Sequence, residues 1–310
     1  MQCPNCQFDH EDQTTECLRC GIVFAKFFRY QEAARHITAP TLVEEGQPQS
    51  LQGAKEELRY RLLALPLALL AAGLLVNTAG GFVRIFLSMW VHEAGHAVTA
   101  WLCGFGAFPG PWFTPVSSSR MLPVAIVVAT VLCFCIYQSW RTGRSALVVG
   151  GVAALTAQLV CTTLPIIEAN ALVIFGGDAG CLVLGSLLMA TFYARRDSSL
   201  YRGALRWGFL VIGAAAFMDA SRTWWGARSD PGFIPFGENE GVGLSDPSRL
   251  TEDYGWAMQT MVDRYVWLGV ACLVFLAVLY VVGIVQARSA VRMKARSSRI
   301  PVKSPSLREK

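Results

Sequence analysis

Long apolar runs constrain the fold of this 310-residue sequence more than any other feature. Each run covers about 16 to 24 residues, and a helix of that length crosses the roughly 30 Å hydrocarbon core of a bilayer. Only 16% of the residues are charged, whereas soluble domains carry about a quarter. The sequence therefore predicts an all-α, multi-pass membrane protein and excludes a water-soluble globule. The runs, which predict about six to seven transmembrane helices, lie at residues 62–76, 82–103, 122–138, 145–165, 171–194, 205–221 and 265–287.

Charge is distributed unevenly around these runs. The formal net charge is +5, but the tail at 288–310 alone holds eight Lys or Arg and one Glu, or +7, which leaves −2 elsewhere. A basic segment directly after an apolar run is typical of a cytoplasmic anchor beside anionic lipid. We therefore expect a lipid bilayer, and no nucleic acid, as its partner. The loop at 223–263 has seven acidic residues and two arginines, so we expect it outside.

The predicted topology contains a parity conflict. The first residues lack the basic and apolar regions of a secretory signal, so we expect the N-terminal module, like the basic tail, in the cytoplasm. Two ends on one side require an even number of crossings, whereas seven runs are present. Either the Gly- and Pro-rich segment Gly104–Arg120 dips back into the protein, or the short first run does not cross fully.

Four cysteines near the start of the sequence have the spacing of a metal site. Cys3 and Cys6 form one C-x2-C pair, and Cys17 and Cys20 form another after ten intervening residues. Four thiolates complete a tetrahedral zinc site without an open position, so the pattern predicts a structural zinc ribbon at residues 1–30. A module this small depends on its metal for folding. We expect it to dock a cytoplasmic protein partner or a substrate.

The remaining boundaries follow from composition. A polar linker with Pro and Gly covers 31–60, a transmembrane domain covers 61–287 and includes the outside loop 223–263, and the basic tail covers 288–310. The other six cysteines are scattered through apolar runs, where a free cysteine packs as a small hydrophobe. They predict no disulfide framework.

One apolar run contains a metal-binding motif. His92, Glu93 and His96 form an H-E-x-x-H pattern, in which the two histidines stand about 40° apart on one helical face. Two imidazoles in this arrangement can bind one metal ion, while Glu93 lies at the edge of the face and can act as a general base. Ionisable residues within a membrane helix are costly and usually functional. A histidine pair that only bridges helices through hydrogen bonds is the alternative.

A catalytic zinc site usually has three protein ligands, so a third side chain is expected. Asp178 lies inside an apolar run among glycines, where an unpaired carboxylate is costly unless a cation neutralises it. Glu168 follows Pro165, lies nearer a membrane surface and can reach water. We therefore predict Asp178 as the third ligand and keep Glu168 as the alternative.

These residues resemble the motifs of the site-2 protease type of intramembrane zinc metalloprotease. His92, Glu93, Gly95 and His96 match the first motif of that family, H-E-x-G-H. The resemblance covers about residues 80–194. It implies a zinc ion, a membrane protein as substrate, and cleavage of peptide bonds within or close to the membrane.

The second motif of that family is matched in part. It places an aspartate eight residues after an asparagine, and Asn170 and Asp178 keep that spacing. Val173 replaces the proline of the motif, and Gly177 and Ala179 replace its leucine and glycine. The resemblance also implies that the segment from Gly104 to Val116 acts as a re-entrant, substrate-binding element.

The sequence favours an intramembrane zinc metalloendopeptidase with two zinc ions, one catalytic and one structural. In such an enzyme a zinc-activated water attacks the scissile carbonyl, and Glu93 accepts the proton of that water. The alternative is a non-catalytic membrane scaffold or adaptor derived from such a protease, which keeps the metal site for shape. A metal transporter would be expected to show more than one cluster of ligands within the membrane.

Overall fold

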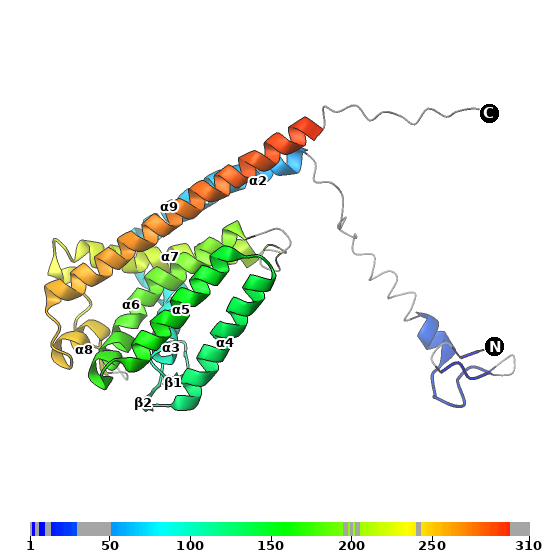
Figure 1. Ribbon diagram of the computed structural model, residues 1–310, viewed down its shortest axis with the longest axis horizontal. Helices are drawn as coiled ribbons and strands as arrows, with labels where there is room; N and C mark the ends of the chain where they lie inside the picture. Colours follow the sequence, from blue (N-terminus) through cyan, green and yellow to red (C-terminus); the bar gives the residue numbers. More distant parts are fainter. Residues whose placement is uncertain are drawn as a thin grey trace. The chain divides into compact units, whose positions relative to one another are not determined.

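A computed structural model of the chain describes residues 2, 3, 6–9, 14–29, 51–194, 198, 201, 205–239 and 243–297 (Figure 1). The chain divides into two compact units, Met1–Gly53 and Ala54–Lys310. Most of the predicted linker, and the part of the basic tail beyond residue 297, lie outside the described residues.

The larger unit is mostly helical, and each of the seven apolar runs is mostly or wholly helical. Its long helices are α2 (Leu51–Val83), α3 (Met89–Leu102), α4 (Leu122–Arg141), α5 (Ser145–Thr163), α6 (Ile166–Ala190), α7 (Leu205–Gly226) and α9 (Met258–Ser297). Shorter elements are the π-helix η1 (Arg84–Ser88), the 3-10 helices η2 (Thr191–Tyr193) and η3 (Pro231–Phe233), the helix α8 (Asp246–Glu252), and the paired strands β3 (Glu238–Asn239) and β4 (Gly243–Leu244).

Five helical stretches among the described residues are long and apolar enough to cross a membrane. They are Leu51–Leu102, Leu122–Arg141, Ser145–Thr163, Ile166–Tyr193 and Met258–Ser297. Five is fewer than the six to seven predicted, because the first two runs join into one stretch with a kink at Ala79 and a π-helical turn at η1. In addition, α7 carries three charged residues and is not among the five. The five stretches indicate a multi-pass membrane protein.

The joined stretch from α2 to α3 traverses the helical bundle once. Near its start, the hydroxyl of Tyr280 on α9 donates a hydrogen bond to the Leu62 carbonyl (3.1 Å). At its end, Cys103 packs beside Ala169, near the first residues of α6. With α4, α5, α6, α7 and α9, the described chain makes six traverses, so α2 begins at the end of the bundle where α9 finishes (Figure 1). An even number of traverses is consistent with two ends on the same side of the bundle.

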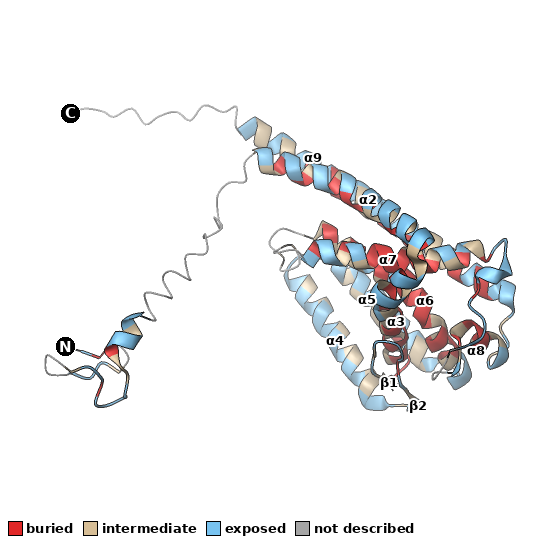
Figure 2. Ribbon diagram, turned by 180° about the vertical axis from the view of Figure 1, so that it is seen from behind, coloured by how far each residue is buried: buried red, intermediate tan, exposed pale blue. Residues whose placement is uncertain are grey.

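Helix α6 forms the centre of the larger unit, and most of its residues are buried (Figure 2). Helix α3 crosses it in direct backbone contact. A Cβ atom added to Gly95 would lie 2.7 Å from the Gly180 Cα and would also collide with the Gly176 carbonyl. Small residues four apart allow this close approach of membrane helices. The approach brings the H-E-x-x-H face of α3 directly against α6.

The α4–α5 pair lies at the edge of the bundle. None of the residues of α4 is buried, and much of the helix is exposed (Figure 2), including the apolar side chains of Ile126, Val127, Val131 and Phe134. In a bilayer, lipid can cover such a surface without cost. The pair therefore adds a membrane-facing wall and contributes little to the buried core.

A β-hairpin forms where the sequence predicted a re-entrant segment. Strands β1 (Phe105–Ala107) and β2 (Val116–Arg120) pair in antiparallel fashion. The Arg120 guanidinium donates to the carbonyls of Leu164 (2.6 Å) and Cys103 (3.1 Å). The base of the hairpin is thus tied to the ends of α3 and α5.

A buried ion-pair network fixes α2 at the other end of the bundle. The Glu57 carboxylate accepts hydrogen bonds from Arg61 (2.8 Å), Tyr201 (2.7 Å) and Arg206 of α7 (3.2 Å). A buried carboxylate needs such partners, because an isolated buried charge is strongly destabilising. The network therefore joins the start of α2 to α7.

The smaller unit is built from two similar turns around the four cysteines. In the first, the Cys3 amide donates to the Phe8 carbonyl (2.9 Å), and Gln7 has a positive φ of 58°. In the second, the Cys17 amide donates to the Ile22 carbonyl (2.9 Å), and Gly21 has a φ of +70°. Each positive φ follows its first cysteine by four residues, so the two C-x2-C pairs adopt matching turns.

We predict that Gly180→Ala destabilises the larger unit by about 1–3 kcal/mol, because the new methyl group would collide with the Gly95 backbone and force α3 away from α6. The measurement is thermal unfolding of the purified protein in detergent. Gly150→Ala on α5 is the matched control, because a Cβ atom there meets nothing within 4 Å. Equal unfolding temperatures for the two variants would contradict the prediction.

Candidate metal centre

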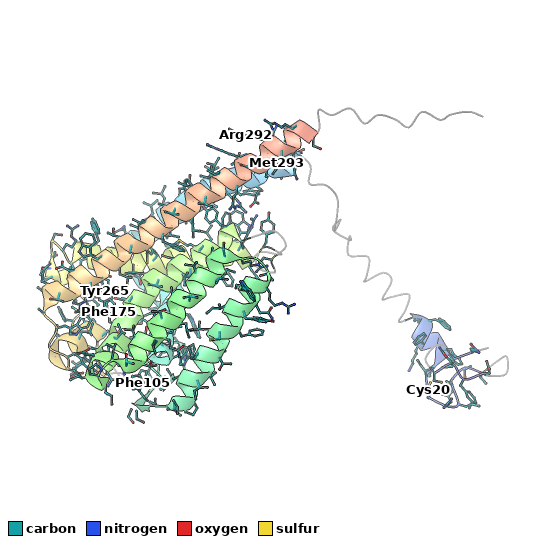
Figure 3. The ribbon with its side chains drawn as sticks, viewed as in Figure 1. Cys20, Phe105, Phe175, Tyr265, Arg292 and Met293 are labelled. Atoms are coloured by element: carbon teal, nitrogen blue, oxygen red, sulfur yellow. The ribbon has the colours of Figure 1, made fainter. Side chains whose placement is uncertain are left out.

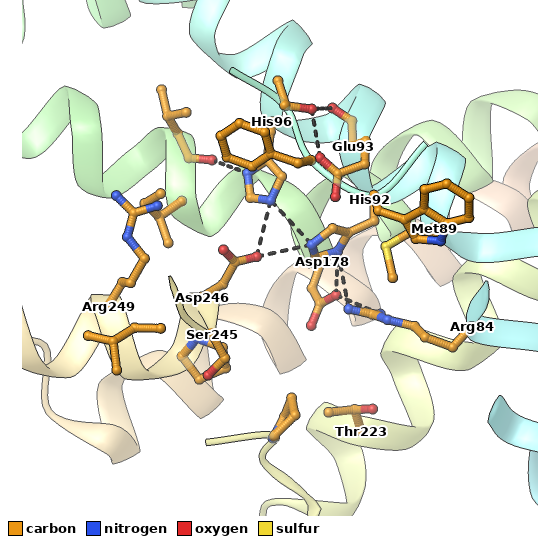
Figure 4. Close-up of a pocket in the computed structure, with 18 of the residues that line it drawn as sticks. Arg84, Met89, His92, Glu93, His96, Asp178, Thr223, Ser245, Asp246 and Arg249 are labelled. Carbon is orange, nitrogen blue, oxygen red and sulfur yellow. Dashed lines mark hydrogen bonds and ion pairs between the residues drawn. The ribbon is translucent and has the colours of Figure 1, made fainter. Parts of the chain in front are cut away.

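A cavity of about 710 Å³ lies among α3, α6, α7, the β-hairpin and the loop that contains α8. His92, Glu93 and His96 from α3 line it, together with Asp178 from α6 and Asp246 from α8 (Figure 4). All but Asp246 are buried. Burying ionisable groups costs folding free energy, so groups of this kind that converge on a cavity usually serve a function.

The partners of the two histidines determine where their protons lie. His96 Nδ1 is 2.8 Å from the Val173 carbonyl, which can only accept a hydrogen bond, so Nδ1 carries the proton. His92 Nδ1 is 2.9 Å from Asp178 Oδ1, and an ionised carboxylate likewise favours a proton on Nδ1. In the neutral imidazoles both Nε2 atoms therefore present lone pairs, and they lie 3.2 Å apart. This pair of nitrogens has the form of a metal ligand set.

Asp246 supplies a third ligand atom that the sequence analysis missed. Its Oδ2 lies 3.0 Å from His92 Nε2 and 3.1 Å from His96 Nε2. These three residues can hold one metal ion. Burial alone would raise the pKa of the Asp246 carboxyl, but the positive charge of the facing His96 and His92 imidazoles, in their protonated form, holds it well below its usual range. A metal ion bound to the neutral imidazoles would supply positive charge in place of those protons. Asp246 is therefore ionised and suited to bind a cation.

Gly177 leaves space beside the two imidazoles. A Cβ atom added to it would lie 2.6 Å from His96 Nε2 and 2.7 Å from His92 Nε2. Any side chain at this position would therefore occupy the region where the nitrogen lone pairs converge. The glycine and the ligand set together fit a metal ion at this position.

Asp178 contacts the opposite side of His92. Its Oδ1 accepts hydrogen bonds from His92 Nδ1 (2.9 Å) and from Arg84 (3.0 Å), and its Oδ2 accepts one from Trp224 Nε1 (2.8 Å). A carboxylate that accepts from the second nitrogen of a ligating histidine fixes its orientation and increases its basicity. The geometry therefore favours Asp246 at the Nε2 atoms and Asp178 as the group that orients His92.

A second set of candidate ligands, formed by His92, Asp178 and Cys181, is less suited to a cation. The Arg84 guanidinium already lies 3.0 Å from Asp178 Oδ1 and 3.4 Å from His92 Nδ1. A metal ion in this set would be repelled by that charge at close range. These charges therefore favour a single metal ion, bound at the Nε2 atoms of the histidines beside Asp246.

Glu93 points into the cavity near the two histidines and is held by the hairpin loop. The Thr114 hydroxyl lies 2.7 Å from Glu93 Oε2 and 3.0 Å from the Glu93 carbonyl. Glu93 is not part of either candidate ligand set in this region. This placement is the one expected for a carboxylate that acts beside a metal without binding it.

The other site residues that the sequence singled out lie as follows. Glu168 is exposed on the first turn of α6 and does not line the cavity. Its role as a third ligand therefore has no support in the geometry. The signal that could have identified Asp246 is weak, because it is one of seven acidic residues in an apparently ordinary loop.

The four N-terminal cysteines form a separate candidate metal centre (Figure 3 labels Cys20). Their sulfur atoms lie within 4.8 Å of one another, with Cys3 to Cys20 at 3.7 Å and Cys6 to Cys17 at 3.6 Å. Four converging thiols can bind a metal ion, and the arrangement is consistent with the predicted zinc ribbon.

Comparison with known proteins adds no family to these observations. No family model, no curated protein and no solved structure matches the chain.

We predict that Asp246→Ala removes about one bound zinc ion per chain, because it deletes a carboxylate ligand from the His92 and His96 site. The measurement is the metal content of the purified full-length protein. Glu168→Ala, which deletes an exposed carboxylate outside the cavity, is the matched control and should keep both ions. Loss of zinc in Glu168→Ala with full retention in Asp246→Ala would reverse the assignment.

Gly177→Ala should also lower the zinc content by about one ion per chain, because the methyl group would occupy the space between the imidazoles. Gly81→Ala is a suitable control, since Gly81 lines the same cavity but a Cβ atom there meets nothing within 4 Å. Retention of both ions in Gly177→Ala would show that the metal does not occupy this space.

Proposed function

We propose that the protein is an intramembrane zinc metalloendopeptidase. The observation that carries the proposal is the convergence of His92 Nε2, His96 Nε2 and Asp246 Oδ2 within about 3 Å of one another, beside the carboxylate of Glu93. Three protein ligands leave a coordination position open, which is typical of catalytic rather than structural zinc sites. The candidate membrane spans around the site favour a membrane protein as the substrate.

The residues around the cavity have distinct roles in the proposed reaction. His92, His96 and Asp246 would hold the metal, and Asp178 keeps His92 in the tautomer that binds through Nε2. A zinc ion at this position supplies Lewis acidity, which polarises the scissile carbonyl and activates water at neutral pH. Glu93 takes a proton from the attacking water and later donates it to the leaving amine.

An aromatic stack lies behind Asp178, formed by residues that do not themselves line the cavity. The Trp224 and Tyr265 rings stack with centroids 3.9 Å apart, and Phe175 stacks on Tyr265 at 4.2 Å (Figure 3). Trp224 also donates to Asp178, so the aromatic stack fixes the carboxylate that orients His92. Trp224 and Tyr265 are buried, and such surroundings strengthen the hydrogen bonds that Asp178 accepts.

The scaffold function remains the second candidate, and one observation favours it. Asp178, which keeps the spacing of the second family motif, is directed at Nδ1 rather than at Nε2 of His92. A site in which Asp246 did not bind metal would lack a third ligand and would not hydrolyse peptides. Because the scaffold also keeps the metal site, zinc content does not separate the two candidates. Cleavage of a membrane protein by the wild type, and its loss in Glu93→Gln, separates them.

We further propose that the cysteine unit binds a structural zinc ion and docks a protein partner or substrate in the cytoplasm. Its metal site is made of sulfur ligands and has no open position, so the unit takes no part in catalysis. The six traverses and the basic residues at the end of α9 support a cytoplasmic location for that end of the bundle.

Glu93→Gln should abolish cleavage of a membrane protein substrate, with a decrease of at least about 10²-fold to 10⁴-fold, while zinc content and folding stay nearly unchanged. Glutamine keeps the shape and the hydrogen bond from Thr114 but cannot take a proton. The assay compares purified wild type and variant on the same substrate in detergent or vesicles. His92→Ala is the contrasting variant and should lose zinc as well as activity. Full turnover by Glu93→Gln would remove the proposed general base.

A further inference from the structure

The loop between β1 and β2 has an exposed tip next to a buried polar residue. Gly110 donates its amide to the Phe113 carbonyl (3.2 Å) and so closes a tight turn with Trp112 near its apex. The side chains of Trp112 and Phe113 are 63% and 54% exposed, and both line the cavity. The next residue, Thr114, is only 7% exposed. The chain therefore changes from exposed to buried within one residue.

Thr114 is buried because it reaches Glu93. Its hydroxyl lies 2.7 Å from Glu93 Oε2 and 3.0 Å from the Glu93 carbonyl, and it has a single proton to donate. The contact with Oε2 is the shorter of the two, so the proton goes to Oε2. Oε2 is thus engaged, which leaves Oε1 as the oxygen available to the cavity.

The base of the loop is held independently of this contact. Trp101 Nε1 donates to the Ala107 carbonyl (3.0 Å), and Arg120 donates to the Leu164 carbonyl (2.6 Å). Removing the Thr114 hydroxyl would therefore leave the hairpin anchored at both strands. The effect of such a change should be confined to the Glu93 carboxylate.

We propose that Thr114 is a positioning residue for Glu93, so that the loop segment whose tip lines the cavity also sets the orientation of the general base. The proposal rests on the proposed function for its catalytic consequence. Its structural half, the hydrogen bond from Thr114 to the Glu93 carboxylate, does not depend on catalysis. Phe113 directly precedes Thr114, and Trp112 precedes Phe113. A peptide bound at the tip would therefore act on the geometry of the base through the residues next to Thr114.

The test compares Thr114→Val with Thr114→Ser in the full-length protein. Valine keeps the shape of threonine but removes the hydroxyl, whereas serine keeps the hydroxyl. Thr114→Val should lower kcat about 10-fold to 100-fold, the cost of losing one hydrogen bond to a charged group, with KM nearly unchanged. Thr114→Ser should restore most of kcat, and both variants should keep the full zinc content.

Ser119→Val is the matched control, because Ser119 is exposed on the same strand, β2, and is not among the residues that line the cavity. It should leave kcat unchanged. A kcat for Thr114→Val equal to that of the wild type would overturn the proposal. The same conclusion would follow if Thr114→Ser were as impaired as Thr114→Val, or if Thr114→Val lost zinc, because the role would then be structural.

A second measurement is independent of cleavage. Infrared difference spectra between the wild type and Thr114→Val should show a shifted carboxylate stretching band, because one carboxylate loses a hydrogen-bond donor. The same comparison in a Glu93→Gln background should lack that band. A band shift that persists in the Glu93→Gln background would overturn the proposal. A band shift that depends on Glu93, in a wild-type protein that cleaves no substrate, would support the hydrogen bond and refute the proposed protease function.

Discussion

The direct backbone contact between α3 and α6 is the constraint on which the candidate site depends. Gly95 lies against Gly176 and Gly180 so closely that neither helix can carry a side chain at the crossing. Lipid offers no hydrophobic driving force between helices, so packing at this distance is what holds two membrane helices in register. The register places His92 opposite Asp178 and His96 opposite the Val173 carbonyl. The tautomers of both imidazoles, and with them the direction of the Nε2 lone pairs, follow from that crossing.

The charges behind the site explain why the candidate third ligand comes from a loop. Asp178 is the acidic residue of α6 nearest to the histidines, but Arg84 and Trp224 already occupy its oxygens. Arg84 in turn bridges to Asp219, which accepts a 2.6 Å hydrogen bond from Ser88. This network neutralises carboxylates inside the bundle, where an unpaired charge is costly. A carboxylate free to bind a metal has to come from outside that network, and Asp246 meets this condition.

The sequence predicted the parts of this structure that depend on local patterns. The helices follow from the apolar runs, and the placement of His92, Glu93 and His96 on one face follows from the helical period. The cysteine spacing likewise predicted the convergence of four sulfur atoms. The contribution of Asp246 could not be predicted, because no local pattern connects α8 with α3 and the contact forms only after the helices pack. The single traverse made by the first two runs fits one of the two alternatives that the sequence left open, in which the short first run does not cross fully. The sequence could not choose between them, since the kink at Ala79 has no proline to signal it.

The position of Asp246 links metal binding to the order of the loop. Helix α8 has seven residues, and an isolated helix of that length is not stable in water. Its conformation depends on tertiary contacts: Leu250 is completely buried in the main core, and the Ser248 hydroxyl accepts a hydrogen bond from the Gly237 amide (2.9 Å). A ligand at the first residue of α8 therefore adds the free energy of metal binding to these contacts, because a metal that binds only the folded arrangement stabilises it. The two histidines lie on the long helix α3, so the free energy of metal binding would mainly stabilise the folded conformation of the loop. The loop is therefore the part of the site whose folding the metal would complete.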